Sequence, residues 1–160
     1  MLTLVSKLTS ISFRDLCKAD LDAVLNIERR AYPLPWSQKM LETSLGKDDC
    51  FGVERAGVLI GYAFVSCVLD EAHLLNICID PAYARKGFGR KLLQYTVSKA
   101  IQKQANVFFL EVRESNRQAI DLYFSEGFNE VGVRPNYYPA AQGKENAVLM
   151  TLELSVDLQV

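Results

Sequence analysis

The chain has 160 residues, in which 18 basic side chains nearly balance 19 acidic ones. This length is expected to give one domain over residues 1–160, and the lack of a basic excess argues against a direct nucleic-acid or membrane partner. No apolar run is long enough for a membrane span, and residues 1–10 lack the apolar core of a signal peptide. We therefore expect a cytoplasmic protein.

The cysteines and the histidine give little reason to expect metal or triad chemistry. Cys17, Cys50, Cys67 and Cys78 include no Cys-x-x-Cys pair, so they predict reduced, buried thiols and no metal site. His73 is the only histidine. It is expected to be structural or exposed rather than part of a Ser-His-Asp triad.

The first third of the chain predicts one strand and two helices. The strand covers residues 10–16, and Asp20 can cap the helix that follows, whose apolar residues recur at helical spacing: Leu21, Val24, Leu25 and Ala31. Residues 32–36 hold two prolines, which end that helix and form an aromatic loop. Ser37 is then predicted to cap a short second helix, which Gly46 ends.

The middle of the chain predicts a hairpin and then a strand-helix-strand unit. Residues 51–55 and 59–68 are strand-like and flank a two-residue turn. Residues 74–79 form an almost unbroken apolar run, which predicts a strand covered on both faces. A helix is predicted from about residue 87 to 104. Residues 107–113 then form a buried strand, parallel to the previous one because a helix connects the two.

The last third predicts one more helix and two more strands. The helix covers residues 115–127, and the strands cover roughly residues 130–137 and 147–154, on either side of a polar loop. The full order is β-α-α-β-β-β-α-β-α-β-β. This order predicts a single α/β domain around a mixed sheet.

Residues 85–90, Arg-Lys-Gly-Phe-Gly-Arg, stand between the apolar strand and the helix, so their glycines lie at a helix N-terminus. There the first main-chain N–H groups have no intrahelical partner and the helix dipole is positive, which suits a phosphate group. Leu92 replaces the third glycine of a Rossmann fingerprint, and the Gly-Lys-Ser/Thr of a P-loop is missing. Both nucleotide motifs are excluded, and an ordinary glycine turn remains the alternative.

This loop resembles the acyl-CoA pyrophosphate loop of the GNAT acetyltransferases, Gln/Arg-x-x-Gly-x-Gly/Ala, although Ala84 stands at the Gln/Arg position. The order of the elements and the segment Asn116-x-x-Ala119-x-x-Leu122-Tyr123-x-x-x-Gly127-Phe128 resemble the GNAT fold over nearly the whole chain. That fold is a mixed sheet with a splayed pair of parallel strands, flanked by helices. Further runs resemble the RimI branch of the family: residues 69–72, 76–77, 110–113, 115–116, 127–130 and 134–139. The resemblance implies acetylation of the N-terminal alanine of a small-subunit ribosomal protein.

The resemblance also implies acetyl-CoA as the co-substrate, without a metal. In the family, the first of the splayed strands pairs with pantetheine through its main chain, which here assigns Ile77, Cys78 and Ile79 to pantetheine and the acetyl group. The pyrophosphate is assigned to Arg85, Lys86, Gly87, Phe88, Gly89 and Arg90. Because no activating histidine motif accompanies Cys78, direct transfer is expected instead of an acetyl-cysteine intermediate.

Two side chains are candidates for proton transfer. Glu111 follows four apolar residues on a predicted buried strand, where desolvation would make it a stronger base. The alternative is that it pairs with Arg113 or caps a neighbouring turn. Tyr123 lies seven residues after Asn116, about two helical turns, so both point to one face. By resemblance, Glu111 is the general base, Tyr123 is the general acid and Asn116 contacts CoA. A plain core tyrosine is the alternative for Tyr123.

Peptide docking is assigned to two aromatic segments, through Tyr32 and Trp36 in the first and Arg134, Tyr137 and Tyr138 in the second. Both segments lie beside the splayed strands in related enzymes, although packing over the core would explain either set equally well. The expected partner is the N-terminus of a ribosomal protein or a similar peptide, and the carboxylates of Glu28, Asp70 and Glu71 are candidates to attract a basic one. The alternatives are acetylation of protein lysine or a small amine, and acetyl-CoA binding without turnover.

Overall fold

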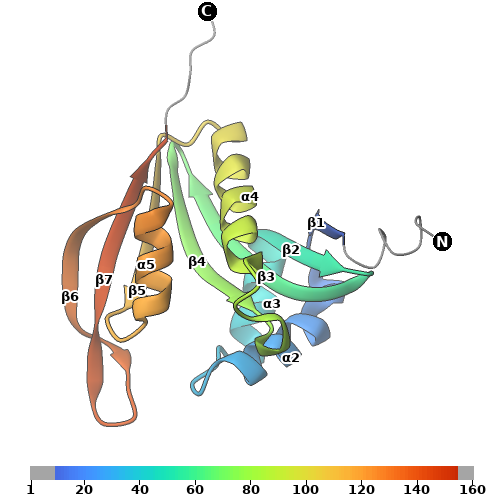
Figure 1. Cartoon of the computed structure of the whole chain (residues 1–160), viewed down its shortest axis with the longest axis horizontal. Helices are drawn as coiled ribbons and strands as arrows, with labels where there is room; N and C mark the ends of the chain where they lie inside the picture. Colours follow the sequence, from blue (N-terminus) through green and yellow to red (C-terminus); the bar gives the residue numbers. More distant parts are fainter. Residues whose placement is uncertain (1–9, 155–160) are drawn as a thin grey trace, which may run out of the picture. The chain divides into compact units, whose positions relative to one another are not determined.

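The computed structural model describes residues 10–154 (Figure 1). Its elements are, in chain order, β1 Ile11–Asp15, the 3₁₀ helix η1 Lys18–Asp20, α2 Leu21–Ala31, α3 Gln38–Lys47, β2 Asp49–Arg55, β3 Val58–Val68, β4 Glu71–Ile79, the 3₁₀ helix η2 Pro81–Tyr83, α4 Phe88–Gln102, β5 Val107–Arg113, α5 Arg117–Ser125, β6 Asn129–Pro139 and β7 Lys144–Glu153. The predicted order of strands and α-helices is confirmed.

The strands form one seven-stranded mixed sheet in the order β1-β2-β3-β4-β5-β7-β6. Its parallel pair is β4 and β5, and their ladder runs only from Glu71 opposite Val107 to Leu74 opposite Leu110. Both strands continue beyond the last of these pairs. The predicted mixed sheet is confirmed, with a parallel pair whose pairing ends part-way along its strands, as a splayed pair requires.

The described residues divide into two compact units. Unit 1 runs as far as Val65 and resumes over Asn76–Thr96, whereas unit 2 comprises Ser66–Leu75 and the residues from Val97 onward. The first half of β4 therefore belongs to unit 2 and its second half to unit 1. That residues 1–160 form one domain stays a prediction.

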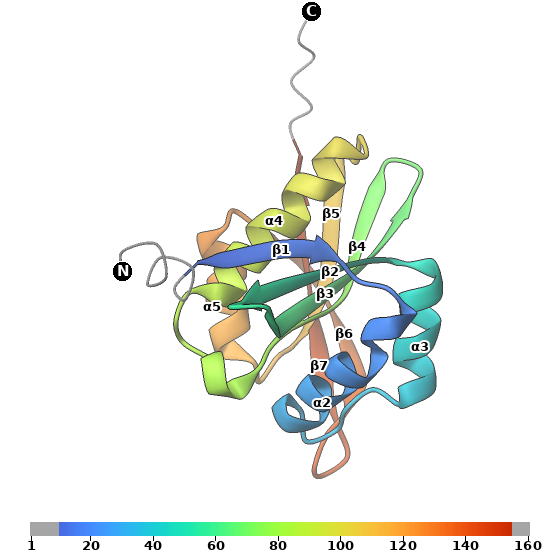
Figure 2. The same ribbon diagram turned by 90° about the vertical axis from the view of Figure 1, so that its right-hand side faces the viewer.

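Unit 1 has an apolar core to which α2, α3 and β3 contribute. The buried side chains are Leu16, Val24, Leu25, Ile27, Leu41, Leu45, Cys50, Tyr62, Phe64 and Cys78. Tyr32 and Trp36 pack against this core and are partly buried. Helices α2 and α3 lie side by side (Figure 2). The loop between them is thus attached to the core by its own aromatic residues.

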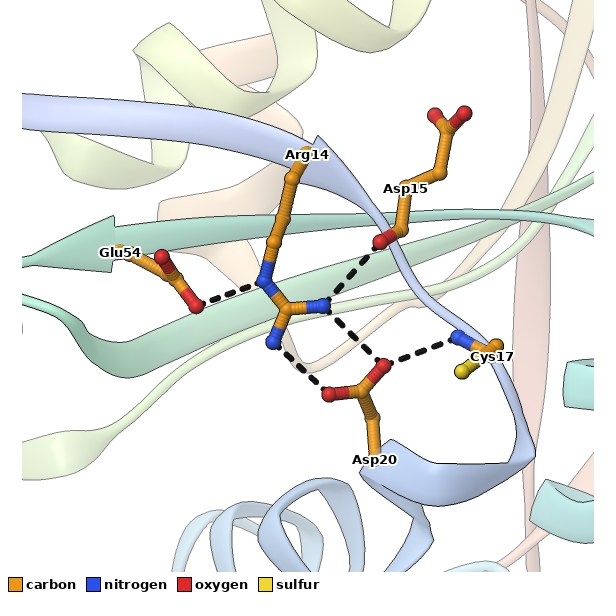
Figure 3. A network of polar contacts seen from close by, with 5 residues as sticks. All are labelled: Arg14, Asp15, Cys17, Asp20 and Glu54. Atoms are coloured by element: carbon orange, nitrogen blue, oxygen red, sulfur yellow. Dashed lines mark hydrogen bonds and ion pairs between the residues drawn. The ribbon is translucent and has the colours of Figure 1, made fainter.

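The predicted side-chain cap of α2 is wrong. The Asp20 carboxylate accepts hydrogen bonds from the Arg14 guanidinium, at 2.8 and 3.1 Å, and from the Cys17 main-chain N–H at 2.9 Å (Figure 3). Arg14 also donates to Glu54 at 2.6 Å. The guanidinium holds the pKa of Asp20 below its usual range. The Asp20 carboxylate thus accepts hydrogen bonds from Arg14 and from the start of η1, and not from the first turn of α2.

The predicted ends of α3 are half right. Ser37 Oγ accepts from the Met40 N–H at 3.2 Å, which confirms the N-cap. The helix does not end at Gly46, however, but continues to Lys47. A Cβ at Gly46 would lie 2.8 Å from Cε of Lys18, which is the far end of an exposed, flexible side chain, so this contact does not itself require a glycine.

Unit 2 packs α5 against β5 through aromatic rings. The rings of Phe108 and Phe128 meet edge to face at 5.9 Å, and Tyr123 of α5 lies 5.7 Å from Phe128. Strands β6 and β7 form a long hairpin, and β7 pairs with β5 (Figure 1). The strand that carries Glu111 therefore lies next to this hairpin in the sheet.

All four cysteines are free, but only Cys50 and Cys78 are buried. The prediction of burial is wrong for Cys17, which is exposed, and for Cys67, which is half-buried. His73 is half-buried, lies 3.1 Å from a Glu71 carboxylate oxygen and stacks on Phe109. These contacts agree with its predicted structural role.

Candidate active site

The loop assigned to pyrophosphate leads directly into α4. Gly87 has a φ of +81° and a Cβ built on it would meet no atom within 4 Å, so the main chain is open to a ligand there. The first intrahelical bond runs from the Lys91 N–H to the Gly87 carbonyl at 3.2 Å. The N–H groups ahead of it belong to the first turn, where the helix dipole favours an anion.

The segment that precedes this loop ends as predicted at Asp80. The Asp80 side chain accepts from the Ala82 N–H at 3.0 Å and pairs with Arg30 at 2.5 Å. Its main-chain N–H donates to the Ile60 carbonyl at 2.8 Å. These contacts attach the end of β4 to α2 and β3 within unit 1.

The expectation that residues 74–79 are covered on both faces is wrong. Of these residues only Cys78 is buried, and Leu75 is 37% exposed. The apolar run signals a strand correctly, but its parallel ladder to β5 ends at Leu74. The hydroxyl of Tyr32 donates to the Ile77 carbonyl at 2.8 Å, so a predicted peptide-docking residue contacts the main chain of a predicted cofactor-binding residue.

Cys78 is unsuited to act as a nucleophile. Burial raises the pKa of its thiol to about 12, and the Glu28 carboxylate adds to the effect. A nucleophilic cysteine must be a thiolate, and such cysteines have lowered pKa values. At neutral pH the Cys78 thiol therefore stays protonated, which favours direct transfer.

Replacing Cys78 by alanine should leave kcat within about threefold of wild type, because direct transfer needs no acyl-enzyme. Intact-protein mass spectrometry after incubation with acetyl-CoA alone should detect no acetylated enzyme. Loss of turnover in the variant, together with an acetyl group trapped on wild-type Cys78, would instead establish a two-step mechanism.

The sequence suggests Glu28 only as a surface charge that attracts a basic peptide, and that expectation is wrong. Glu28 is 1% exposed in unit 1, and both of its carboxylate oxygens accept hydrogen bonds. The donors are the Trp36 main-chain N–H, the Tyr62 hydroxyl and the Asn76 amide. A signal was present, because Glu28 falls four residues after Val24 on the apolar stripe of α2.

In unit 2, the candidate base Glu111 meets all three docking residues predicted from the second aromatic segment. Its carboxylate lies 3.3 Å from Arg134 Nε, and Tyr137 makes a hydrogen bond to it that raises the pKa of the Tyr137 phenol. The Tyr138 hydroxyl donates to the Glu111 main-chain carbonyl at 3.2 Å. The Glu111 side chain is 27% exposed, so it is less buried than predicted.

The alternative ion pair between Glu111 and Arg113 does not form. Arg113 instead pairs with Glu145 at 2.8 Å, donates to the Pro139 carbonyl at 2.6 Å and lies over the ring of Tyr138. Glu145 also accepts from the Ser115 N–H at 3.2 Å. Arg113 thus holds the end of the β6–β7 hairpin and leaves the Glu111 carboxylate to Arg134.

A bulge in β6 brings Arg134 and Tyr137 to Glu111. Arg134 pairs with Ala147, and the next pair is Tyr138 with Glu145. The chain thus advances four residues along β6 but only two along β7. Asn136, at a φ of +52°, turns the chain within the bulge. Ala147 lies opposite Arg134 on one side and Arg113 on the other, and residues in register share a face. The small side chain of Ala147 lets Arg134 extend across β7.

Tyr123 and Asn116 both lie at α5 in unit 2. Tyr123 is 5% exposed, and burial raises the pKa of its phenol above the usual range, with a smaller contribution from Tyr138. Asn116 is the N-cap of α5, since its side-chain oxygen accepts from the Ala119 N–H at 3.2 Å. The structure therefore gives Asn116 a local structural role beside the predicted contact with CoA.

The predicted site residues thus gather in two groups. Unit 1 holds Tyr32, which contacts Ile77, together with Trp36, the rest of residues 77–79 and the glycine loop. In unit 2, Arg134, Tyr137 and Tyr138 all contact Glu111. Between residues 10 and 154, no cluster of three or more His, Cys, Asp or Glu side chains is arranged to hold a metal ion. Over the same residues, no helix has the length and apolarity to cross a membrane.

The chain is similar to known acetyltransferases over most of its length. Residues 21–128 match the model of the acetyltransferase (GNAT) family. The ribosomal protein bS18-alanine N-acetyltransferase of Escherichia coli K12 is 42% identical over 138 residues, which cover 86% of this chain and 93% of that enzyme. A Bacillus subtilis protein, a putative enzyme of the same name, is 31% identical over 92% of this chain and 98% of its own length.

Solved structures give the same picture. The crystal structure of the ribosomal-protein-S18-alanine N-acetyltransferase from Escherichia coli superposes with a TM-score of 0.87 at 40% identity, covering 91% of this chain and 95% of that one. A Bacillus subtilis acetyltransferase in complex with CoA has a TM-score of 0.78 at 17% identity, with 91% of this chain and all of that chain covered. At that identity the second match shows a shared fold only.

Proposed function

Because the chain belongs to the GNAT acetyltransferase family, we propose that it transfers the acetyl group of acetyl-CoA to the α-amine of the N-terminal alanine of ribosomal protein bS18. The observation that carries the proposal is the 42% identity to the Escherichia coli enzyme of that name, over nearly the full length of both chains. A ribosomal-protein substrate would locate the reaction in the cytoplasm, without a nucleic-acid or membrane partner.

Members of this family use acetyl-CoA, and the residues of unit 1 suit it. The open main chain at Gly87 and the first turn of α4 would receive the pyrophosphate, with Arg85, Lys86 and Arg90 adding positive charge. The main chain of residues 77–79, beyond the end of the parallel ladder, would pair with pantetheine. No metal is part of the proposed reaction.

Glu111 and Tyr123 would carry the protons of the transfer. The amine nitrogen forms a bond to the acetyl carbonyl carbon while the carbon–sulfur bond breaks. Glu111 accepts the proton that the amine loses, directly or through water, and Tyr123 donates a proton to the departing thiolate. The raised pKa of the Tyr123 phenol keeps that proton in place at neutral pH.

An α-amine is a better match for this site than a lysine side chain. At pH 7, about 14% of an α-amine of pKa ~7.8 is neutral, compared with about 0.04% of a lysine of pKa ~10.4. Choosing the α-amine thus spares the site roughly 3.5 kcal/mol of deprotonation. A single carboxylate base such as Glu111 suits this smaller demand.

The test uses a peptide with the N-terminal sequence of bS18, free or α-blocked, incubated with acetyl-CoA and the purified protein. Mass spectrometry should detect one acetyl group on the free peptide and none on the blocked one. Equal modification of both peptides would identify lysine as the target. No modification of either peptide, with CoA still bound, would favour a small amine or a binding function without turnover.

A further inference from the structure

Glu28 is a buried carboxylate in the core of unit 1, on the face of α2 that also buries Val24 and Leu25. Removing a carboxylate from water is unfavourable unless its oxygens are hydrogen-bonded. Here all three donors are neutral groups, so no cation offsets the desolvation of Glu28. An apolar residue would fill the same position on the stripe without that cost. What Glu28 contributes must therefore come from the hydrogen bonds that its carboxylate accepts.

The donors to Glu28 come from three separate segments. Oε1 accepts from the Trp36 main-chain N–H at 2.7 Å, and Oε2 accepts from the Tyr62 hydroxyl of β3 and from Asn76 Nδ2 of β4 at 3.2 Å. Asn76 directly precedes residues 77–79, which are assigned to the acetyl group and pantetheine. One side chain thus joins the loop of residues 32–36 to the start of the cofactor segment.

Besides the bond to Glu28, Tyr32 and the Trp36 ring attach the loop of residues 32–36 to unit 1. Its two prolines lack N–H donors, and Leu34 is 53% exposed. Tyr32 is attached through its N–H, which donates to the Glu28 main-chain carbonyl at 3.0 Å, and through its hydroxyl on the Ile77 carbonyl at 2.8 Å; the Trp36 ring packs 6.2 Å from that of Phe64. The main chain at Trp36 is therefore set by Glu28, while Tyr32 makes a second link to β4.

We propose that Glu28 is a positioning residue for the peptide substrate: it holds the docking loop, residues 32–36, in register with the β4 segment that carries the acetyl group. The inference rests on the proposed function, since it assumes that this loop receives the peptide. Both Glu28 oxygens are already occupied by protein donors, so Glu28 acts through the loop and not on the reacting atoms.

The test replaces Glu28 by glutamine, which keeps the shape but turns one acceptor oxygen into an amide N–H₂ that faces donors. The KM for the bS18 peptide should rise about 10- to 100-fold, the effect of losing a hydrogen bond to a charged group. The kcat and the KM for acetyl-CoA should stay within about threefold. Asp22→Asn, at an exposed site of the same helix, is the control and should change none of these values.

Tyr32→Phe provides a second variant, which keeps the ring on the core and removes only the hydroxyl on Ile77. It should raise the peptide KM about 3- to 10-fold, the effect of a neutral hydrogen bond. This variant decides the matter if Glu28→Gln does not fold.

The outcomes separate this inference from the proposed function. An unchanged peptide KM in both variants, with an active wild-type enzyme, would overturn the inference alone, even if Glu28→Gln melted at a lower temperature. Wild-type protein that does not acetylate the bS18 peptide would overturn the proposed function and this inference with it.

Discussion

Replacing Glu111 by glutamine should lower kcat by about 100-fold or more while the dissociation constant of acetyl-CoA stays within about twofold. Glutamine has the size of glutamate and can still accept a hydrogen bond from Tyr137, but it cannot take a proton from the amine. It also removes the charge that pairs with Arg134. Steady-state kinetics with the bS18 peptide, and calorimetric titration with acetyl-CoA, measure the two quantities separately.

Glu130→Gln is the matched control for this experiment. Glu130 is an exposed carboxylate on β6 of the same unit, and its replacement should leave kcat unchanged. A Glu111→Gln enzyme that keeps wild-type kcat would remove Glu111 from proton transfer. A parallel loss of acetyl-CoA affinity would instead indicate that Glu111 serves binding.

Tyr123→Phe should also lower kcat by about 100-fold or more, because it removes the proton donor for the leaving thiolate. The ring remains, so its packing on Phe128, at 5.7 Å between centroids, is kept and the fold should persist. Tyr95→Phe removes a hydroxyl from a ring that stacks on Phe13 in unit 1, and it should have no such effect. Thermal melting of both variants controls for stability.

The pH dependence of kcat gives an independent reading of Tyr123. A raised pKa means that the phenol keeps its proton to higher pH than the usual value of ~10. Activity should therefore show no alkaline decline that is due to Tyr123 below about pH 10. If kcat instead declines with a midpoint below pH 9, and this decline disappears in Tyr123→Phe, the raised pKa of the Tyr123 phenol is contradicted.

The order of the elements was predictable because strong local signals mark it. The pair Ala56 and Gly57 takes positive φ values of 51° and 77°, as a two-residue hairpin turn requires. The prolines of the docking loop end α2, and Ser37 begins α3 through its own side chain. Each of these features depends only on residues that are close to it in the sequence.

The error at Asp20 arose where a distant partner competes with the local signal. Asp20 is a residue type that caps helices, but here its carboxylate accepts its hydrogen bonds from Arg14 and Cys17. Gly46 has the chemistry of a helix end, but α3 runs one residue further, to Lys47. The pairing of Asp20 with Arg14 cannot be identified from the residues that adjoin Asp20.

The candidate site shows the same division. The glycine loop and Glu111 stand out in the sequence, because a loop motif and a carboxylate on an apolar strand are local patterns. The ion-pair partner of Glu111 cannot be recognised in the sequence, because Arg134 reaches Glu111 through a bulge that shifts the register of β6. Glu28 was detectable as a charge on an apolar stripe, but its role depends on the donors that surround it.

The bulge in β6 also bears on how this enzyme could be redesigned. The ladder pairs on either side of it, up to Arg134 and from Tyr138, hold the hairpin together, so residues 135–137 carry little of the strand pairing. A combinatorial library confined to Pro135 and Tyr137, which leaves Asn136 at its positive φ, should change which N-termini are accepted while most variants still fold. The hairpin thus gives protein engineers a place to alter selectivity without rebuilding the scaffold.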